Sequence, residues 1–179
     1  RGLELSSDAP LDMNGTLKFA TGGRAPFALD LSAHLPAAWL APHFSPDLEP
    51  SGAVLVTATV SSGDGALTAR ADFSDTDLGW SLFRKKAGFP LALTASGEWK
   101  GGSARMSGGR VEVAGEQLPF TLKDGLPRAD QIALSLEPLS PLLPDGGTLG
   151  GRISGSYGGA GGALVLNFHG VHAQIAPDL

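Results

Sequence analysis

The 179-residue sequence has no cysteine, which excludes disulfides, thiolate metal sites and cysteine nucleophiles together. It also lacks any run of about 18 apolar residues, the length that a membrane-spanning helix needs. No signal-peptide pattern is present, and the sequence starts at Arg1 without an initiator methionine. We therefore expect residues 1–179 to form one β-rich segment of a larger protein, with any membrane anchor outside it.

Positive charge is scarce. The chain has 13 Lys and Arg against 18 Asp and Glu, a formal net charge of −5, and these charges are scattered. A nucleic-acid-binding domain gathers Lys and Arg on one surface. The composition therefore excludes nucleic acid as a partner.

Catalytic and metal-binding motifs are missing as well. Gly151 to Gly155 reads Gly-Arg-Ile-Ser-Gly, which is the wrong register for a serine nucleophile elbow. His169 and His172 lie three apart, a spacing that sends them to opposite faces of a strand. Asp72 to Asp77 lacks the glycine and the closing glutamate of a calcium loop and reads as a solvated turn. We expect a non-enzymatic chain with no catalytic residue, no metal site and no cofactor.

Turn-forming residues are abundant, with 26 glycines and 13 prolines, and apolar residues recur with period two between them. In a strand this period gives one apolar and one polar face. Glycine-rich turns at roughly ten-residue spacing, such as Ser107-Gly108-Gly109 and Lys123-Asp124-Gly125, predict hairpins. Two proline-bounded stretches, Pro36 to Ala41 and Leu139 to Leu143, predict single helical turns. The fold class is therefore all-β, with the strands joined as an antiparallel meander.

The order of these elements repeats along the chain. A strand, a proline-rich stretch, a glycine, a second strand, a glycine-rich hairpin and a third strand occur over residues 29–80, and again over residues 134–179. Repetition of a strand unit is typical of proteins built by stacking similar pieces. We therefore predict an internal repeat.

Two stretches resemble a known family. The first, Asp77 to Leu91, contains the turn Lys85-Lys86-Ala87-Gly88-Phe89-Pro90, and the second is the strand Leu93 to Trp99. Together with Pro50-Ser51-Gly52, they resemble the AsmA-like superfamily, the bacterial envelope proteins that include the TamB and YhdP types. The resemblance covers about residues 29–123, with a weaker echo from residue 134 onward.

This resemblance implies a periplasmic location, in a parent protein anchored to the inner membrane of a Gram-negative bacterium. It implies a long, strongly curved antiparallel sheet whose concave side is apolar. Phospholipid acyl chains are the implied ligand, carried between the inner and outer membranes in support of envelope integrity. Other envelope proteins are the further partners that it suggests.

A sheet with one apolar face must cover that face with something, and the sequence offers no amphipathic helix for it. We therefore expect an apolar groove for lipid, with anionic headgroups met by the basic run Arg84, Lys85 and Lys86. The candidate groove residues are Phe27, Leu29, Leu31, Leu67, Phe73, Leu91, Leu93, Val111, Val113, Leu164, Leu166 and Phe168.

Two alternatives stay open at this level. The same apolar residues suit the closed core of a β-sandwich or barrel. The chain also suits a structural or adhesive β-repeat module of a large envelope protein, in which the sheet is a spacer and its outer face binds a partner.

Overall fold

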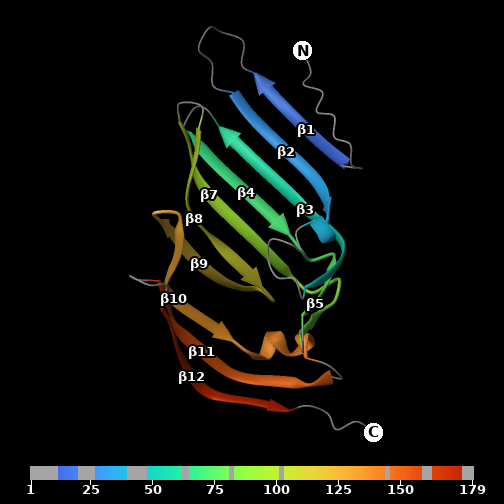
Figure 1. The fold of residues 1–179 in the computed structure, drawn as a ribbon, viewed down its shortest axis with the longest axis vertical. Coiled ribbons are helices and arrows are strands. Elements are labelled where there is room, and N and C mark those ends of the chain that lie inside the picture. The colour runs from blue at the N-terminus through green and yellow to red at the C-terminus, as the bar shows by residue number, and fades with distance from the viewer. Residues whose placement is uncertain are drawn as a thin grey trace.

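One open antiparallel sheet makes up most of the protein (Figure 1). The computed structural model describes residues 12–19, 27–39, 48–61, 65–80, 83–100, 103–143, 146–158 and 163–174, with the backbone alone at 12–19, 27, 28, 80 and 83. The strands are β1 (Asp12–Phe19), β2 (Phe27–Pro36), β3 (Glu49–Ser61), β4 (Ala66–Asp72), β5 (Thr76–Trp80), β6 (Phe83–Lys85), β7 (Leu91–Lys100), β8 (Ser103–Val113), β9 (Glu116–Lys123), β10 (Leu126–Ser135), β11 (Thr148–Gly158) and β12 (Ala163–Gln174).

The strands follow one another across the sheet almost in chain order. The main path runs β1-β2-β3-β4-β7-β8-β9-β10-β11-β12, and every pairing is antiparallel. The path has two separate ends and does not close. The predicted all-β meander is therefore confirmed, and the closed sandwich or barrel is ruled out.

The strands β5 and β6 leave this path. Residues Glu49–Gly52 at the start of β3 pair with β5, which pairs in turn with β6. We call residues 76–90, which include this hairpin, the arm. The two 3₁₀ helices, η1 (Ala37–Trp39) and η2 (Glu137–Leu142), fall inside or overlap the predicted helical turns, and η2 lies against β11 and β6.

Strand register places the apolar side chains on one face of the sheet. Residues opposite each other in neighbouring antiparallel strands point to the same side. Starting from Leu31 in β2, one such row across the sheet is Leu31, Ala58, Ala69, Ala95, Gly109 and Phe120. Rows through Leu29 and Ala33 are apolar too, and the residues between them are mostly polar.

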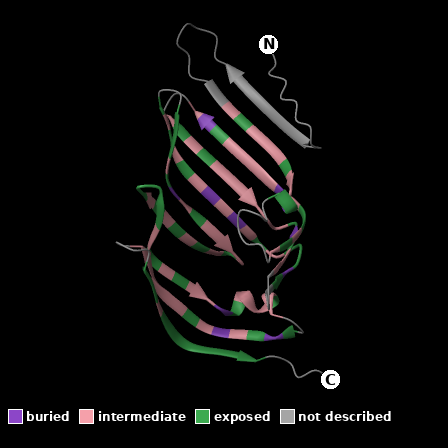
Figure 2. Ribbon diagram, in the orientation of Figure 1, coloured by how far each residue is buried: buried purple, intermediate pink, exposed green. Residues whose placement is uncertain are grey.

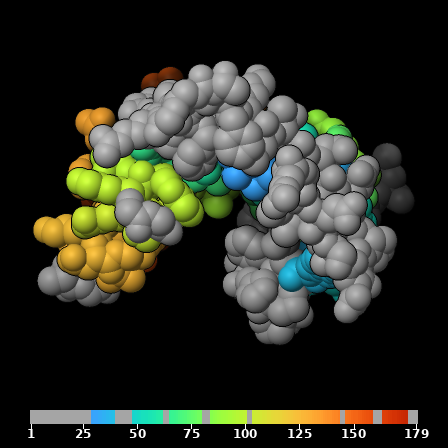
Figure 3. Space-filling view, turned by 90° about the horizontal axis from the view of Figure 1, so that it is seen from above, coloured from blue at the N-terminus to red at the C-terminus, as the bar shows by residue number. Residues whose placement is uncertain are grey.

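The apolar face is the concave one. In Figure 3 the coloured, described part of the molecule curves from blue and teal through yellow-green to orange around one side of a hollow. Along β9, side chains alternate between half-buried on the apolar face and exposed on the polar face, and in the described chain this strand packs chiefly against its neighbours β8 and β10. Crowding of this kind is what a bend toward the apolar face produces. We call this surface the concave face and the opposite one the convex face.

Few side chains are buried in a conventional core (Figure 2). The solvent-accessible surface is 12248 Å², whereas a compact monomer of this length exposes roughly 8,000 Å². The buried apolar residues of the described chain are Ala37, Val54, Val60, Ala92 and Leu136. Within the described residues, the sheet is therefore a single layer, with no second sheet packed on its apolar side.

Two of the predicted turns have different outcomes. Asp124 and Gly125 both have positive φ, 55° and 77°, as the two-residue turn between β9 and β10 requires. Ser107-Gly108-Gly109, in contrast, lies inside β8, and the prediction of a turn there is wrong. The register shift opposite Ser96 and Gly97 shows the reason, because Ser107 is the extra residue of a β-bulge.

The two segments of the predicted repeat share an order of elements. In both, a strand leads to a 3₁₀ helix and then to an antiparallel strand pair, β2-η1-β3-β4 and β10-η2-β11-β12. The fourth residue of each following strand is a glycine with positive φ, Gly52 at 87° and Gly151 at 98°. These parallels support the repeat, which remains a prediction.

Candidate functional site

The predicted groove residues converge on the concave face. Leu29 and Leu67 are linked through Val60, while Leu93 pairs directly with Val111 and Leu91 with Val113. Phe73 follows β4 directly and donates its main-chain N–H to the carbonyl of Leu91 at 2.8 Å. The sheet therefore brings candidates from four strands, β2, β4, β7 and β8, together with Phe73 into one apolar surface.

The candidates of β12 lie on the same face at the far end of the sheet. Leu164, Leu166 and Phe168 pair with Tyr157, Gly155 and Ile153 of β11. Leu164 and Phe168 are 57% and 62% exposed. The side chain of the remaining candidate, Phe27, lies outside the described residues.

Small residues form the floor of the concave face at the middle of the strands. Ala58, Ala69, Ala95 and Gly109 stand in one row between Leu31 and Phe120. A Cβ built on Gly109 would lie close to Thr94 O and 3.0 Å from the Cα of Ala95. The backbones thus approach each other too closely for a side chain, and we call this row the floor. Larger side chains on either side of it form walls.

The basic run divides into one buried and two exposed residues. Lys85 is only 6% exposed, and its Nζ donates to the carbonyls of Thr76, Ser74 and Lys86 at 2.7, 3.2 and 3.3 Å. Burial lowers the pKa of Lys85, and the nearby carboxylates of Asp77, Asp75 and Asp72 oppose that shift. The prediction that Lys85 meets a lipid headgroup is therefore wrong, because its ammonium is buried and hydrogen-bonded to main-chain carbonyls of the arm and of the turn before it.

The exposed pair, Arg84 and Lys86, lines a cleft of about 800 Å³ between the arm and η2. A second cleft of about 460 Å³ shares Lys86 and Pro141 with the first. We call the two together the rim cleft, because they lie where β6, the turn before β7 and η2 meet. Its other lining residues are Ala87, Gly88, Phe89, Pro90, Ala114, Pro138, Ser140, Leu143, Gly146 and Gly147.

The rim cleft combines cations with apolar walls. Phe89 and Pro90 supply apolar surface from the arm, while Pro141 and Leu143 supply it from η2 and the residue after it. The sequence identified Arg84 and Lys86 but did not indicate that η2 lies beside them, because these residues are more than 50 positions apart and meet only through the folded sheet. The proline-bounded stretch was the available signal, and it indicated a helical turn without its neighbour.

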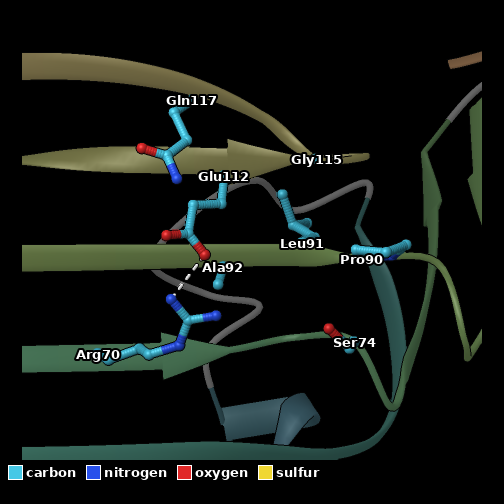
Figure 4. Close-up of a pocket in the computed structure, with 8 residues that line it drawn as sticks. All are labelled: Arg70, Ser74, Pro90, Leu91, Ala92, Glu112, Gly115 and Gln117. Carbon is cyan, nitrogen blue, oxygen red and sulfur yellow. Dashed lines mark hydrogen bonds and ion pairs between the residues drawn. The ribbon is translucent and has the colours of Figure 1, made fainter. Parts of the chain in front are cut away.

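The convex face carries an ion network instead of an apolar surface (Figure 4). Arg70 Nη1 donates to Glu112 Oε2 at 2.7 Å and Arg70 Nη2 to Asp72 Oδ2 at 3.2 Å, while Arg110 Nε donates to Glu112 Oε1 at 2.7 Å. The hydrogen bond to Glu112 raises the pKa of Arg70. A small pocket of about 130 Å³ lies beside it, with Gln117 among its lining residues. Because each cation already has a carboxylate, this network ties β4, β7 and β8 together and offers no free charge.

The acidic turn is likewise occupied by the chain itself. Asp72 Oδ1 accepts the Ser74 N–H at 2.9 Å, and Asp77 Oδ1 accepts the Ala87 N–H at 2.9 Å. Hydrogen bonds from Ser74, its side chain first, lower the pKa of Asp72. Asp72 thus fixes the turn that precedes the arm, and Asp77 links the two sides of the arm.

Chemistry-bearing side chains elsewhere are few. Ser154 Oγ and His169 Nε2 lie 2.9 Å apart on the exposed convex face, as cross-strand neighbours of β11 and β12. In the described part of the chain no three His, Cys, Asp or Glu side chains gather to hold a metal ion. None of its helices has the length and apolar character to cross a bilayer.

Comparison of the chain with protein-family models, with curated proteins and with solved structures finds no match.

Proposed function

We propose that this chain is a non-catalytic lipid-holding segment, in which phospholipid acyl chains cover the concave face. The observation that carries the proposal is the uncovered apolar face of a single curved sheet, walled by leucine and valine and floored by alanine and glycine. Apolar side chains that stay partly exposed together on one sheet face are typical of a surface that binds another molecule.

The energetics favour an acyl chain as that molecule. Removing apolar surface from water contributes about 25 cal/mol per Å², so burial of one acyl chain along the concave face contributes several kcal/mol. A floor of small residues leaves room for a chain to lie across the strands. The described strands do not close on themselves, so the sheet itself sets no barrier along the direction in which its strands follow one another.

The rim cleft is the matching site for the headgroup. Arg84 and Lys86 are exposed there beside Pro141 and Leu143, so a phosphate can meet two cations while the start of its acyl chains meets apolar walls. The resemblance to the AsmA-like superfamily supports the same ligand, and it supports a periplasmic location and a role in transfer of phospholipid between the inner and outer membranes.

Photocrosslinking from adjacent residues of β4 tests the proposal. A benzophenone amino acid replaces Leu67, on the concave face, or Thr68, exposed on the convex face, and the protein is purified from a Gram-negative host. Irradiation is expected to attach phospholipid at position 67 and not at position 68, with matching lipid in native mass spectra. Equal labelling at both positions, or no lipid at either in folded protein, contradicts the proposal.

A further inference from the structure

The sheet is weakly joined between β9 and β10. Both strands lie wholly within the described range 103–143. They pair next to their hairpin turn alone, through Lys123–Leu126, Leu122–Pro127 and Thr121–Arg128. From there β9 extends back to Glu116 and β10 extends on to Ser135 without pairing with each other. We call this unpaired stretch the split.

A proline explains where the pairing stops. The turn Asp124-Gly125 has two residues with positive φ, so the pair that closes this hairpin is hydrogen-bonded and bonded pairs alternate from it. After Thr121, the next β9 residue that would donate to β10 is Pro119, which has no N–H. The turn Ala114-Gly115 gives the same phase, because it leaves Pro119 outside the bonded pairs of β8 and β9. The ladder therefore ends before it reaches Asp130.

A β-bulge in β10 lies at the same point. Asp130 and Gln131 of β10 stand opposite the single residue Ser156 of β11. A bulge bends the strand that carries it. The sheet thus divides into a first section, β1 to β9 with the arm, and a second section, β10 to β12 with η2.

The split ends at the rim cleft. Ala114, in the turn before β9, and Pro138, in η2 after β10, both line the cleft of about 460 Å³. The cations of the rim cleft belong to the first section, whereas Pro141 and Leu143 belong to the second (Figure 1). Between the last pair and its first residue β9 runs about 17 Å. A small rotation at the three pairs therefore becomes a larger change in the width of the rim cleft.

We propose that the three pairs are a hinge, and that a phospholipid bound in the rim cleft closes it by touching both sections. The bonds that fix the two walls allow this motion, because those of Lys85 and Asp77 stay within the first section and those of Ser140 within the second.

A ligand shifts such an equilibrium only when it binds one form better than the other. A phospholipid does so here, because its phosphate meets the cations of one wall while its acyl chains meet the apolar residues of the other. Closure by lipid thus rests on the proposed lipid-holding function, whereas the hinge does not depend on it.

Distances between spin labels test the hinge in a chain that has no cysteine of its own. Gln117→Cys with Glu137→Cys places labels at exposed residues on either side of the split, and Gln117→Cys with Thr59→Cys is the control within the first section. Without lipid, double electron–electron resonance is expected to give a distance distribution about twofold broader for the first pair than for the control. Equal breadth overturns the hinge.

Proline variants test the origin of the hinge. Pro119→Val supplies the missing N–H to β10 and is expected to narrow the lipid-free distribution between positions 117 and 137 about twofold. Pro127→Val is the matched control, because Pro127 lies in the unbonded pair with Leu122 and its main chain faces away from β9. A Pro119→Val distribution as broad as that of Pro127→Val overturns the role assigned to the missing donor.

Dihexanoyl phosphatidylglycerol, a soluble phospholipid, is the probe for closure. In excess it is expected to move the distribution between positions 117 and 137 to shorter distances and to narrow it about twofold, with the control pair unchanged. A distribution that stays broad overturns closure by lipid. Photocrosslinking from position 67 separates this failure from that of the proposed function, because lipid attached there leaves the proposed function standing, and its absence overturns that function as well.

Discussion

Single residues decide which cations are available to a ligand. Lys85 and Lys86 are neighbours in the sequence. Lys85, the last residue of β6, is buried, whereas Lys86, the first residue after β6, is exposed. The ammonium donates to three main-chain carbonyls, of which the bond to Thr76 is fully buried and those to Ser74 and Lys86 are partly buried. Replacing Lys85 is therefore expected to affect the stability of the fold, and replacing Lys86 is expected to affect ligand binding.

Lys85→Met is expected to lower the free energy of unfolding by about 1–3 kcal/mol, the cost of leaving buried acceptors without a donor. The matched variant Lys86→Met is expected to change it by less than about 0.5 kcal/mol, as exposed substitutions do. Urea denaturation followed by circular dichroism measures both. Equal stability of the two variants would contradict the role assigned to Lys85.

Lys86→Met is instead expected to weaken binding of vesicles that contain anionic phospholipid, because one of the two cations of the rim cleft is lost. Flotation with phosphatidylglycerol vesicles measures this, and vesicles of phosphatidylcholine alone are the control lipid. An unchanged bound fraction on anionic vesicles would remove Lys86 from the headgroup site.

The carboxylates of the convex network predict an acid limit to stability. Hydrogen bonds from Arg110 and Arg70 hold the pKa of Glu112 below its ordinary value of 4.5, and Asp72 is held below 3.8. A lowered carboxyl pKa stabilises the fold above the unfolded-state value, and that stabilisation is lost as pH falls through the folded-state value. Unfolding free energies should therefore decline below about pH 4.5.

Glu112→Gln tests the origin of that decline. The variant is expected to lose less stability than the parent between pH 4.5 and pH 3, because position 112 no longer titrates. Glu98→Gln changes an exposed carboxyl on the convex face of β7 and is expected to follow the parent curve. Guanidinium titrations at each pH provide the comparison.

Within the elements, two glycines are required for different physical reasons. Gly109 has no room for a Cβ because the backbone of β7 is too close, whereas Gly115 has open space around it and a φ of 87°. Gly109→Ala is expected to cost about 1–3 kcal/mol through overpacking. Gly115→Ala is expected to cost about 1 kcal/mol through its backbone angle alone. Thermal denaturation ranks the two variants, and the reverse order would contradict the tight approach of β7 and β8.

Element type and face were predictable from period-two alternation, because each strand has one apolar side. The bulge at Ser107 was not, since a Ser-Gly-Gly sequence serves equally in a hairpin and at a close approach within a strand. The arm was also missed as a separate hairpin, because β6 is only three residues long. Its position depends on Lys85 and Asp77, which act through contacts that local sequence does not reveal.

At the scale of the whole molecule, the open or closed state of the sheet was undecided by sequence. The same leucines and valines suit a sealed core and an open trough, since their alternation fixes a face but not what covers it. The strand path decides this point, because its two ends do not pair with each other. The sequence could thus predict which apolar residues share a face, but not whether that face is an open surface or part of a closed core.

A large side chain placed on the floor tests whether lipid binds along the concave face. Ala69→Phe places a large side chain between Ala58 and Ala95, and is expected to reduce copurified phospholipid several-fold in native mass spectra. Thr68→Phe, next to it on the convex face, is expected to keep the parent amount. Added lipid should also raise the melting temperature of the parent and of Thr68→Phe, but not of Ala69→Phe, because a ligand stabilises only the state that binds it.

The near-sequential strand order also determines how such a protein folds and changes in length. Each main-path strand pairs with the one before it in the chain, apart from the excursion through the arm. A sheet ordered in this way can grow by adding one hairpin after another, as repeat proteins do. Insertion or loss of a hairpin therefore lengthens or shortens the sheet and leaves the pairing of the other strands unchanged.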